Sequence, residues 1–244
     1  MNLIIDAGNS YVKIAVFQNN NLIFVDSVSY KSFFIDLTNV LKNHPNIKYG
    51  ILSSVGAFSS NDIYEIDKRI CLIEVRDKIK LPFSNLYKTI NTLGKDRLAL
   101  ISASMINYTK ENVLVIDAGT CITFDFKNKD DEYLGGAISP GINMRYNSLN
   151  YYTSSLPLLK KEVINGNYLG NSTEACMHSG VVNGVVQEID GVVAQYKSKY
   201  KDLTVILTGG DANFLSLQLK SSIFANSNFL LEGLNYLLNY NLKE

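Results

Sequence analysis

The segment Ile5-Asp6-Ala7-Gly8-Asn9-Ser10 is echoed by Ile116-Asp117-Ala118-Gly119-Thr120-Cys121 in the second half of the chain. Each copy follows an apolar run typical of a strand, and a second such run comes after it. The repeat therefore predicts two β-hairpins, each with an acid and a glycine at its turn. Glycine lets backbone amides approach an anion, the next polar side chain adds a donor, and the carboxylate can hold a cation. Two such turns facing each other would clamp a polyphosphate and its metal.

The first half of the chain is expected to combine a strand meander with an α/β alternation. Strands are predicted over 3–5, 12–17 and 22–28, with Asn19-Asn20-Asn21 as a turn, which makes an antiparallel meander. Apolar periodicity then predicts a helix over 32–41, a buried strand over 49–55, a helix over 60–70 and a strand over 71–75. This order favours a mixed sheet flanked by helices.

A glycine and an acid precede the next helix, and a second series of strands follows it. Gly94-Lys95-Asp96-Arg97 comes just before an apolar helical pattern that begins at residue 98. Strands are predicted over 113–116, 122–126, 135–138 and 204–207. Asn171 and Glu174 resemble a capping box before a long buried helix over 181–193, and a last helix covers 230–238. We expect two closely joined lobes, 1–110 and 111–244.

Composition points to a soluble protein with a small-molecule partner. Of 244 residues 46% are hydrophobic, and Lys+Arg and Asp+Glu both number 23, so no basic excess favours nucleic acid or anionic lipid. No apolar stretch approaches the roughly 20 residues of a membrane span, and we expect a cytoplasmic protein. Cys71, Cys121 and Cys176 are widely spaced, which predicts reduced core thiols rather than disulfides or a zinc site.

Six ordered motifs resemble those of type III pantothenate kinase, a family of the acetate and sugar kinase, chaperone ATPase and actin superfamily. No single motif is specific, but the order of all six is, and the resemblance covers nearly the whole chain. The motifs are Asp6-Ala7-Gly8-Asn9-Ser10-Tyr11-Val12-Lys13, Gly94-Lys95-Asp96-Arg97, Asp117-Ala118-Gly119-Thr120, Gly135-Gly136-Ala137-Ile138-Ser139-Pro140-Gly141, Gly170-Asn171-Ser172-Thr173 and Thr208-Gly209-Gly210-Asp211.

The resemblance implies an α/β fold of two duplicated actin-like (ribonuclease H-like) lobes with the active site in the cleft between them. It implies ATP-dependent phosphorylation of pantothenate to 4′-phosphopantothenate, the first step of coenzyme A biosynthesis, by a homodimer whose active site lies near the interface. Tyr146, Tyr151 and Tyr152 form a candidate interface segment. The glycines of Thr208-Gly209-Gly210-Asp211 would let the backbone approach an adenosine.

The two hairpins differ in what they offer to ATP. In the first, the ATP-binding segment would be Asp6, Ala7, Gly8, Asn9, Ser10, Tyr11, Val12 and Lys13: amides and side chains donate to the phosphates, Lys13 neutralises charge, and Asp6 holds Mg²⁺ through water. In the second, the resemblance places a monovalent cation, K⁺ or NH₄⁺, on Asp117 and a phosphate contact on Thr120. A second Mg²⁺ ligand or a turn-forming acid is the alternative for Asp117.

Asp96 is the candidate catalytic base. A carboxylate is too weak to deprotonate an alcohol beforehand, so Asp96 would orient the substrate hydroxyl and accept its proton late along a loose transition state. The resemblance adds Tyr87, Gly94, Lys95, Arg97 and Thr173 as substrate contacts. Taken alone, Asp96 and Arg97 could be a surface pair at a helix start, where the acid caps the helix and complements its dipole, and Thr173 could simply cap a helix.

Two other functions remain open at this point. The same fold could phosphorylate another small hydroxylated acid or a sugar. The resembled family has also been described as a transcriptional accessory factor, which would make the chain a nucleotide-binding regulator. Intact Asp6, Asp96 and Asp117 favour an enzyme, because a pure regulator needs no catalytic base.

Overall fold

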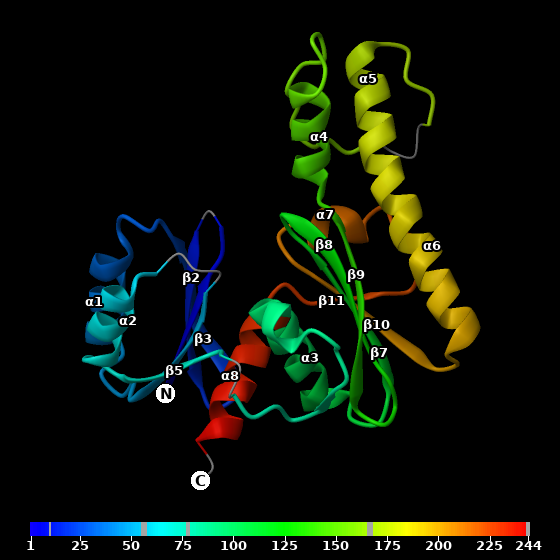
Figure 1. Ribbon diagram of the computed structural model, residues 1–244. Coiled ribbons are helices and arrows are strands. Elements are labelled where there is room, and N and C mark those ends of the chain that lie inside the picture. The colour runs from blue at the N-terminus through cyan, green and yellow to red at the C-terminus, as the bar shows by residue number, and fades with distance from the viewer. Residues whose placement is uncertain (10, 55–57, 77–78, 165–167, 243–244) are drawn as a thin grey trace. The chain divides into compact units, whose positions relative to one another are not determined.

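The computed structural model describes residues 1–9, 11–54, 58–76, 79–164 and 168–242. By its internal contacts the chain divides into two compact units, Met1–Thr109 with Phe229–Glu244, and Lys110–Asn228. Each unit contains a β-sheet with helices packed on it (Figure 1). Over the described ranges, no helix combines the length and the apolar character that crossing a bilayer requires.

The sheet of the first unit starts with the predicted antiparallel meander. Its strands run in the order β3-β2-β1-β4-β5, and β4 and β5 continue the sheet in parallel pairing. The strands are β1 (Asn2–Ala7), β2 (Val12–Gln18), β3 (Asn21–Val28), β4 (Tyr49–Ser54) and β5 (Cys71–Glu74). The predicted strand over 49–55 is found, although Val55 lies outside the described residues.

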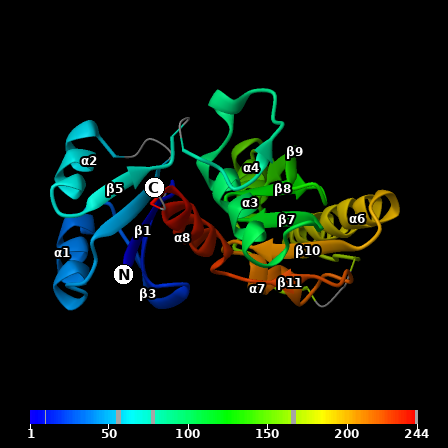
Figure 2. The same cartoon turned by 90° about the horizontal axis from the view of Figure 1, so that it is seen from below.

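Both faces of this sheet are covered, because alternate residues of the central strand β1 pack against different helices. Leu3 and Ile5 belong to a core with α1 and α2, whereas Ile4 belongs to a second core with α3 and α8. Figures 1 and 2 both show α1 and α2 on one side of this sheet and α8 on the other. The helices are α1 (Phe33–Asn43), α2 (Ser60–Asp67), α3 (Lys95–Asn107) and α8 (Phe229–Asn241); the short β6 (Ser84–Asn85) and η1 (Ile90–Thr92) precede α3.

The second unit repeats the same plan. Within it the strand order is β11-β10-β7-β8-β9, with β7, β8 and β9 antiparallel and β10 and β11 parallel additions. Alternate residues of β7, β8 and β10 form one core with the valines of α6. The strands are β7 (Asn112–Ala118), β8 (Cys121–Lys127), β9 (Glu132–Pro140), β10 (Leu203–Thr208) and β11 (Phe224–Ala225).

A long helical segment of the second unit contains a π-helical turn. The predicted helix over 181–193 is found within η2 and α6, which follow α5 directly; η2 is the π-helix. Ser179 donates from its hydroxyl to the Tyr168 carbonyl at 2.7 Å, and Asn183 donates to the Ser179 hydroxyl at 3.1 Å. The helices of this unit are α4 (Ile142–Tyr151), α5 (Thr173–His178), η2 (Ser179–Asn183), α6 (Gly184–Lys199) and α7 (Ala212–Ser216).

The C-terminal helix departs from the predicted grouping of residues 111–244. Helix α8 packs with the first unit because its leucines share a core with Ile4 and Ala99. Asn2 also donates from its amide to Asn235 and Asn239 of α8, both at 2.8 Å, and Asn235 donates to the Asn19 carbonyl at 3.0 Å. The boundary of the predicted lobes near residue 110 stays a prediction.

The prediction of core thiols was wrong in its placement of the cysteines. All three are free, but Cys71 and Cys176 are exposed and Cys121 is half-buried. The reason is local: Cys71 starts the edge strand β5, and Cys176 of the short helix α5 lines a cavity in place of packing in the core.

Candidate active site

Asp6 lies near the end of β1, where two neighbouring strands bring it a cation and a hydroxyl. In register with it are Lys13 on the antiparallel strand β2 and Ser53 on the parallel strand β4. The Ser53 side chain hydrogen-bonds the Asp6 carboxyl group. Ser53 is buried and was not predicted as a site residue. Its position at the end of a strand predicted to be buried was the one sequence signal that could have indicated it.

The environment of Asp6 opposes its negative charge. Burial raises the pKa of Asp6 from an ordinary value of 3.8 to about 6; Lys13 lowers it, the Asp96 carboxylate raises it, and the Ser53 hydrogen bond lowers it. A raised pKa means that the ionised carboxylate is costly in the ligand-free protein. A bound cation would relieve that cost, so the donor set suits a metal ion.

The turn after Asp6 is a closed hairpin with polar groups at its tip. The Gly8 amide donates to the Tyr11 carbonyl at 3.1 Å, and Asn9 and Tyr11 are exposed. Ala7 and Val12 are buried in the core, so any ATP contact they make would come from their backbones. Ser10, predicted to bind ATP, lies outside the described residues.

Asp96 occupies the first turn of α3, as predicted, with Gly94 as the N-cap residue. One Asp96 carboxylate oxygen, Oδ1, accepts from the Arg97 amide at 2.8 Å. A Cβ atom at Gly94 would come within 2.3 Å of that oxygen, so this arrangement of the carboxylate requires glycine. Lys95 donates from Nζ to the Ser54 carbonyl at 3.0 Å, which ties the start of α3 to the end of β4.

Arg97 and Tyr87 also come together. The Arg97 guanidinium lies over the Tyr87 ring, 5.4 Å from its centroid, and Arg97 is almost fully buried. The Tyr87 amide donates to the Asn85 side chain at 3.0 Å, which orders the segment before α3. Two predicted substrate residues, Arg97 in the first turn of α3 and Tyr87 in the segment before it, thus form a cation–π pair.

The second hairpin places Asp117 at the position equivalent to Asp6, but with different neighbours. Its register partners are Thr123 on β8 and Thr208 on β10, whereas Asp6 has Lys13 and Ser53. Gly209 approaches this hairpin closely: its φ is 94°, and a Cβ atom there would lie 2.4 Å from both the Asp117 carboxylate and the Ala118 carbonyl. Thr120, at the tip, is exposed.

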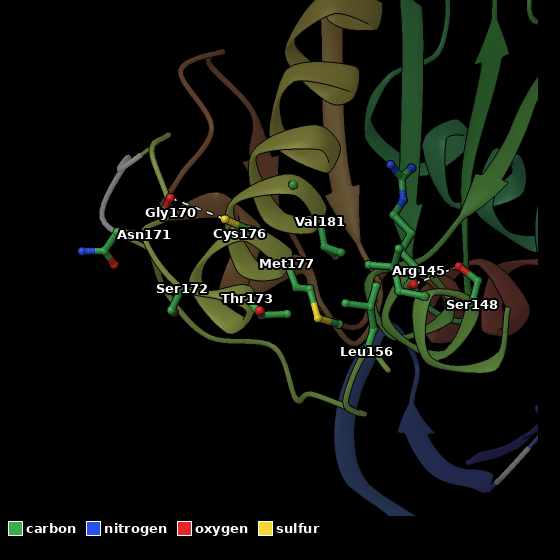
Figure 3. Close-up of a pocket in the computed structure, with 12 residues that line it drawn as sticks. Arg145, Ser148, Leu156, Gly170, Asn171, Ser172, Thr173, Cys176, Met177 and Val181 are labelled. Atoms are coloured by element: carbon green, nitrogen blue, oxygen red, sulfur yellow. Dashed lines mark hydrogen bonds between the residues drawn. The ribbon is translucent and has the colours of Figure 1, made fainter. Parts of the chain in front are cut away.

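Thr173 lines a cavity of about 970 Å³ within the second unit, together with residues of α4 and the α4–α5 connection. Figure 3 shows its side chain with those of Met177 and Leu156 around this cavity. The predicted capping box at Asn171 and Glu174 was wrong. Ser172 is the N-cap residue, and its hydroxyl accepts from the Ala175 amide at 3.2 Å.

The candidate interface tyrosines divide into two kinds. Tyr146 is fully buried and its hydroxyl hydrogen-bonds Nδ1 of His178 at 2.8 Å, so it belongs to the core. Tyr151 and Tyr152 are 80% and 81% exposed and contact each other edge to face. Only the last two retain the solvent-facing surface that an interface needs.

The first unit therefore assembles Asp6, Lys13, Ser53 and Asp96 into one electrostatically coupled cluster. Among the described residues, no three His, Cys, Asp or Glu side chains gather as a ready-made metal site. A metal bound at Asp6 would have to complete its coordination with phosphate oxygens or water, as Mg²⁺ commonly does. The clamp formed by both hairpins, with the active site in a cleft between lobes, stays a prediction.

Comparison with known proteins identifies relatives along the whole chain. The family model of type III pantothenate kinase matches residues 2–195. A type III pantothenate kinase of Christiangramia forsetii is 49% identical over 241 residues, 99% of each chain.

Two solved structures show the same fold. One, from Campylobacter jejuni and described as a Baf family transcriptional activator, matches with a TM-score of 0.64 at 22% identity over 98% of each chain. The other, a glucokinase from an Antarctic psychrotroph, matches with a TM-score of 0.53 at 11% identity over 98% of each chain. These two matches concern the fold alone, which is the predicted pair of actin-like lobes, each a mixed sheet flanked by helices.

Proposed function

The chain belongs to the type III pantothenate kinase family, and from this premise we propose a role for the cluster of Asp6, Lys13, Ser53 and Asp96. This cluster would hold the ATP phosphates, with Asp96 as the catalytic base. Members of the family phosphorylate pantothenate in coenzyme A biosynthesis with ATP as the phosphoryl donor. The observation that carries the assignment is the coupling of Asp6, Lys13 and Asp96 within one unit. It means that a cation able to neutralise phosphate charge and a second carboxylate lie within electrostatic reach of Asp6.

Asp96 would orient the primary hydroxyl of pantothenate and take its proton as the oxygen attacks the γ-phosphorus. In a loose transition state the alcohol loses its proton late, so positioning and charge neutralisation supply most of the rate. The Arg97 amide holds one oxygen of Asp96 at 2.8 Å, which leaves the other oxygen as the acceptor for the substrate proton. Asn9 and the hairpin amides would hold the β- and γ-phosphates.

Asp6 would hold Mg²⁺ through water. When bound, Mg²⁺ neutralises charge that develops on the phosphate oxygens. The raised pKa of Asp6 supports this role, since a cation favours the ionised carboxylate that burial opposes. Asp117 would hold the monovalent cation, K⁺ or NH₄⁺, and Thr120 would contact a phosphate. The threonine neighbours of Asp117, where Asp6 has a lysine, support a different cation at the second hairpin.

The pantothenate site would combine Tyr87, Gly94, Lys95, Asp96 and Arg97. The Arg97–Tyr87 pair is suited to a carboxylate or hydroxyl, because a guanidinium fixed over a ring keeps its donors oriented. Lys95 would contact a substrate with the Nζ protons that its bond to the Ser54 carbonyl does not use, since an ammonium group has three donors. Thr173, which lines the cavity of the second unit, would be a further contact to pantothenate.

A homodimer is the assembly we propose, in the cytoplasm. Tyr151 and Tyr152 expose two adjacent aromatic rings at the end of α4, the helix that contributes Ser148 and Leu149 to the cavity that Thr173 lines. Burying them against a second copy would remove large apolar surfaces from water. Sedimentation of the native protein and of a Tyr151→Ser, Tyr152→Ser variant tests this: a monomeric native protein contradicts the dimer.

A coupled assay of ADP release tests the role of Asp96. Asp96→Asn should lower kcat by about 10²- to 10⁴-fold with pantothenate, Mg²⁺ and K⁺ present. The matched control is Asp36→Asn, the same change in the first turn of α1, which should leave kcat unchanged. Near-native turnover by Asp96→Asn would show that Asp96 is not the catalytic base. If a sugar is phosphorylated while pantothenate is inert, the assignment of pantothenate as the substrate is wrong.

A further inference from the structure

We propose that Tyr30 is a positioning residue for the ATP-binding hairpin, acting through the Gly8 carbonyl. The Tyr30 hydroxyl donates to that carbonyl across 22 residues of sequence. The proposal rests on the role assigned above to the first hairpin, and it adds a residue that none of the six motifs contains.

The contact controls the direction of the next amide. In a trans peptide the carbonyl oxygen and the following N–H point in opposite directions. Holding the Gly8 oxygen toward Tyr30 therefore turns the Asn9 amide away from Tyr30. The Gly8 amide is already bonded to the Tyr11 carbonyl at 3.1 Å, so both sides of this glycine are held. The Asn9 amide is thus oriented before ATP arrives, ready to donate to a phosphate.

The Tyr30 ring is itself held in place by aromatic packing. It contacts Phe58 edge to face with 5.7 Å between centroids, and Phe58 contacts Phe33 at 4.8 Å. Phe33 is fully buried at the start of α1. The preceding turn is closed by the Ser32 amide, which donates to the Ser29 carbonyl at 3.2 Å. The hydroxyl is therefore presented by a packed core and not by a loose side chain.

The hydroxyl also remains a donor at working pH. Burial, and secondarily the Asp6 carboxylate, raise the pKa of Tyr30 above its ordinary value of 10. The same Asp6 is the proposed Mg²⁺ residue, so Tyr30 lies within electrostatic reach of the site that it orders. An acceptor role for the phenol is excluded at Gly8, because a carbonyl oxygen has no proton to donate.

Steady-state kinetics of Tyr30→Phe test the proposal, since phenylalanine keeps the ring packing and removes only the hydroxyl. We expect the KM for ATP to rise about five- to tenfold, as for the loss of one orienting hydrogen bond, while the KM for pantothenate and the urea midpoint stay near native. Tyr64→Phe, which removes a hydroxyl from an exposed ring of α2, is the control and should behave as native protein.

Two results overturn the proposal. One is a KM for ATP within twofold of native in Tyr30→Phe; the other is a parallel rise of both KM values, which indicates general loosening of the fold. Asn9→Ala separates the proposal from its premise. If Asn9→Ala raises the KM for ATP but Tyr30→Phe does not, the hairpin binds phosphate without help from Tyr30. If neither variant changes it, the phosphate role assigned to the Asn9 side chain falls together with the proposal for Tyr30.

Discussion

Replacing Asp6 with asparagine should stabilise the ligand-free protein at neutral pH while it removes ATP turnover. The pKa of Asp6 rises from 3.8 to about 6 on folding, chiefly through burial. One unit of pKa corresponds to about 1.4 kcal/mol, so the ionised carboxylate costs the folded state about 3 kcal/mol. Asparagine has nearly the same shape and can still hydrogen-bond Ser53, but it brings no charge to bury.

The sign of the pH dependence follows from proton binding. Between the two pKa values the folded state binds more protons at Asp6 than the unfolded state does, so its stability falls as pH rises. Native protein should therefore gain about 2 kcal/mol through this group as the pH falls from about 7.5 to about 4.5. The variant lacks the group, and its stability advantage should shrink by that amount over the same interval.

Urea unfolding followed by far-ultraviolet circular dichroism measures both effects; the chain contains no tryptophan for fluorescence. Subtracting native from variant values at each pH cancels the contributions of the other titrating groups. A variant that is less stable than native protein near pH 7.5, or an advantage that does not change with pH, refutes the reasoning. ADP release should be lost in the same variant, because the proposed Mg²⁺ residue has no charge.

Three further predictions concern the surroundings of the site. Gly94→Ala should lower kcat about tenfold or more with little change in the urea midpoint, because its Cβ would lie 2.3 Å from the Asp96 carboxylate and turn it away; native kcat contradicts the geometry. Asn235→Ala should lower the free energy of unfolding by about 2 kcal/mol, since it removes bonds to Asn2 and Asn19 in a buried setting; a loss under about 0.5 kcal/mol in urea titration argues against that network. K⁺ should raise the rate of the native enzyme over that in Na⁺, and Asp117→Asn should abolish the difference; a variant that keeps the full K⁺ effect moves the cation elsewhere.

Most of the local structure could be predicted from the sequence. The first three strands, the second hairpin and the helix after Gly94 were all found, because alternating apolar residues and turn residues act over a few neighbours. The family resemblance also came from short motifs, each formed by a few neighbouring residues, and from the order in which they occur. Errors came where a choice between adjacent residues depended on tertiary context, as with the helix cap at Ser172 in place of Asn171.

The neighbours of Asp6 could not be predicted from the sequence pattern. Lys13 and Ser53 become neighbours of Asp6 only through strand register, and Asp96 joins them from a helix ninety residues away in sequence. Tyr30 reaches Gly8 through side-chain packing that no short motif records. Helix α8 joins the first unit because one face of that sheet needs an apolar cover, a demand made by a surface and not by a segment.

The duplicated Ile-Asp-Ala-Gly phrase specified two acidic hairpins, since strand alternation and a glycine turn are properties of a short stretch of chain. How the two acids differ was a matter of folding. Asp6 has a lysine and a hydroxyl beside it and a raised pKa, whereas Asp117 lies between threonines. Charge and burial depend on which distant segments pack nearby, so identical phrases acquire different chemistry only in the assembled sheets.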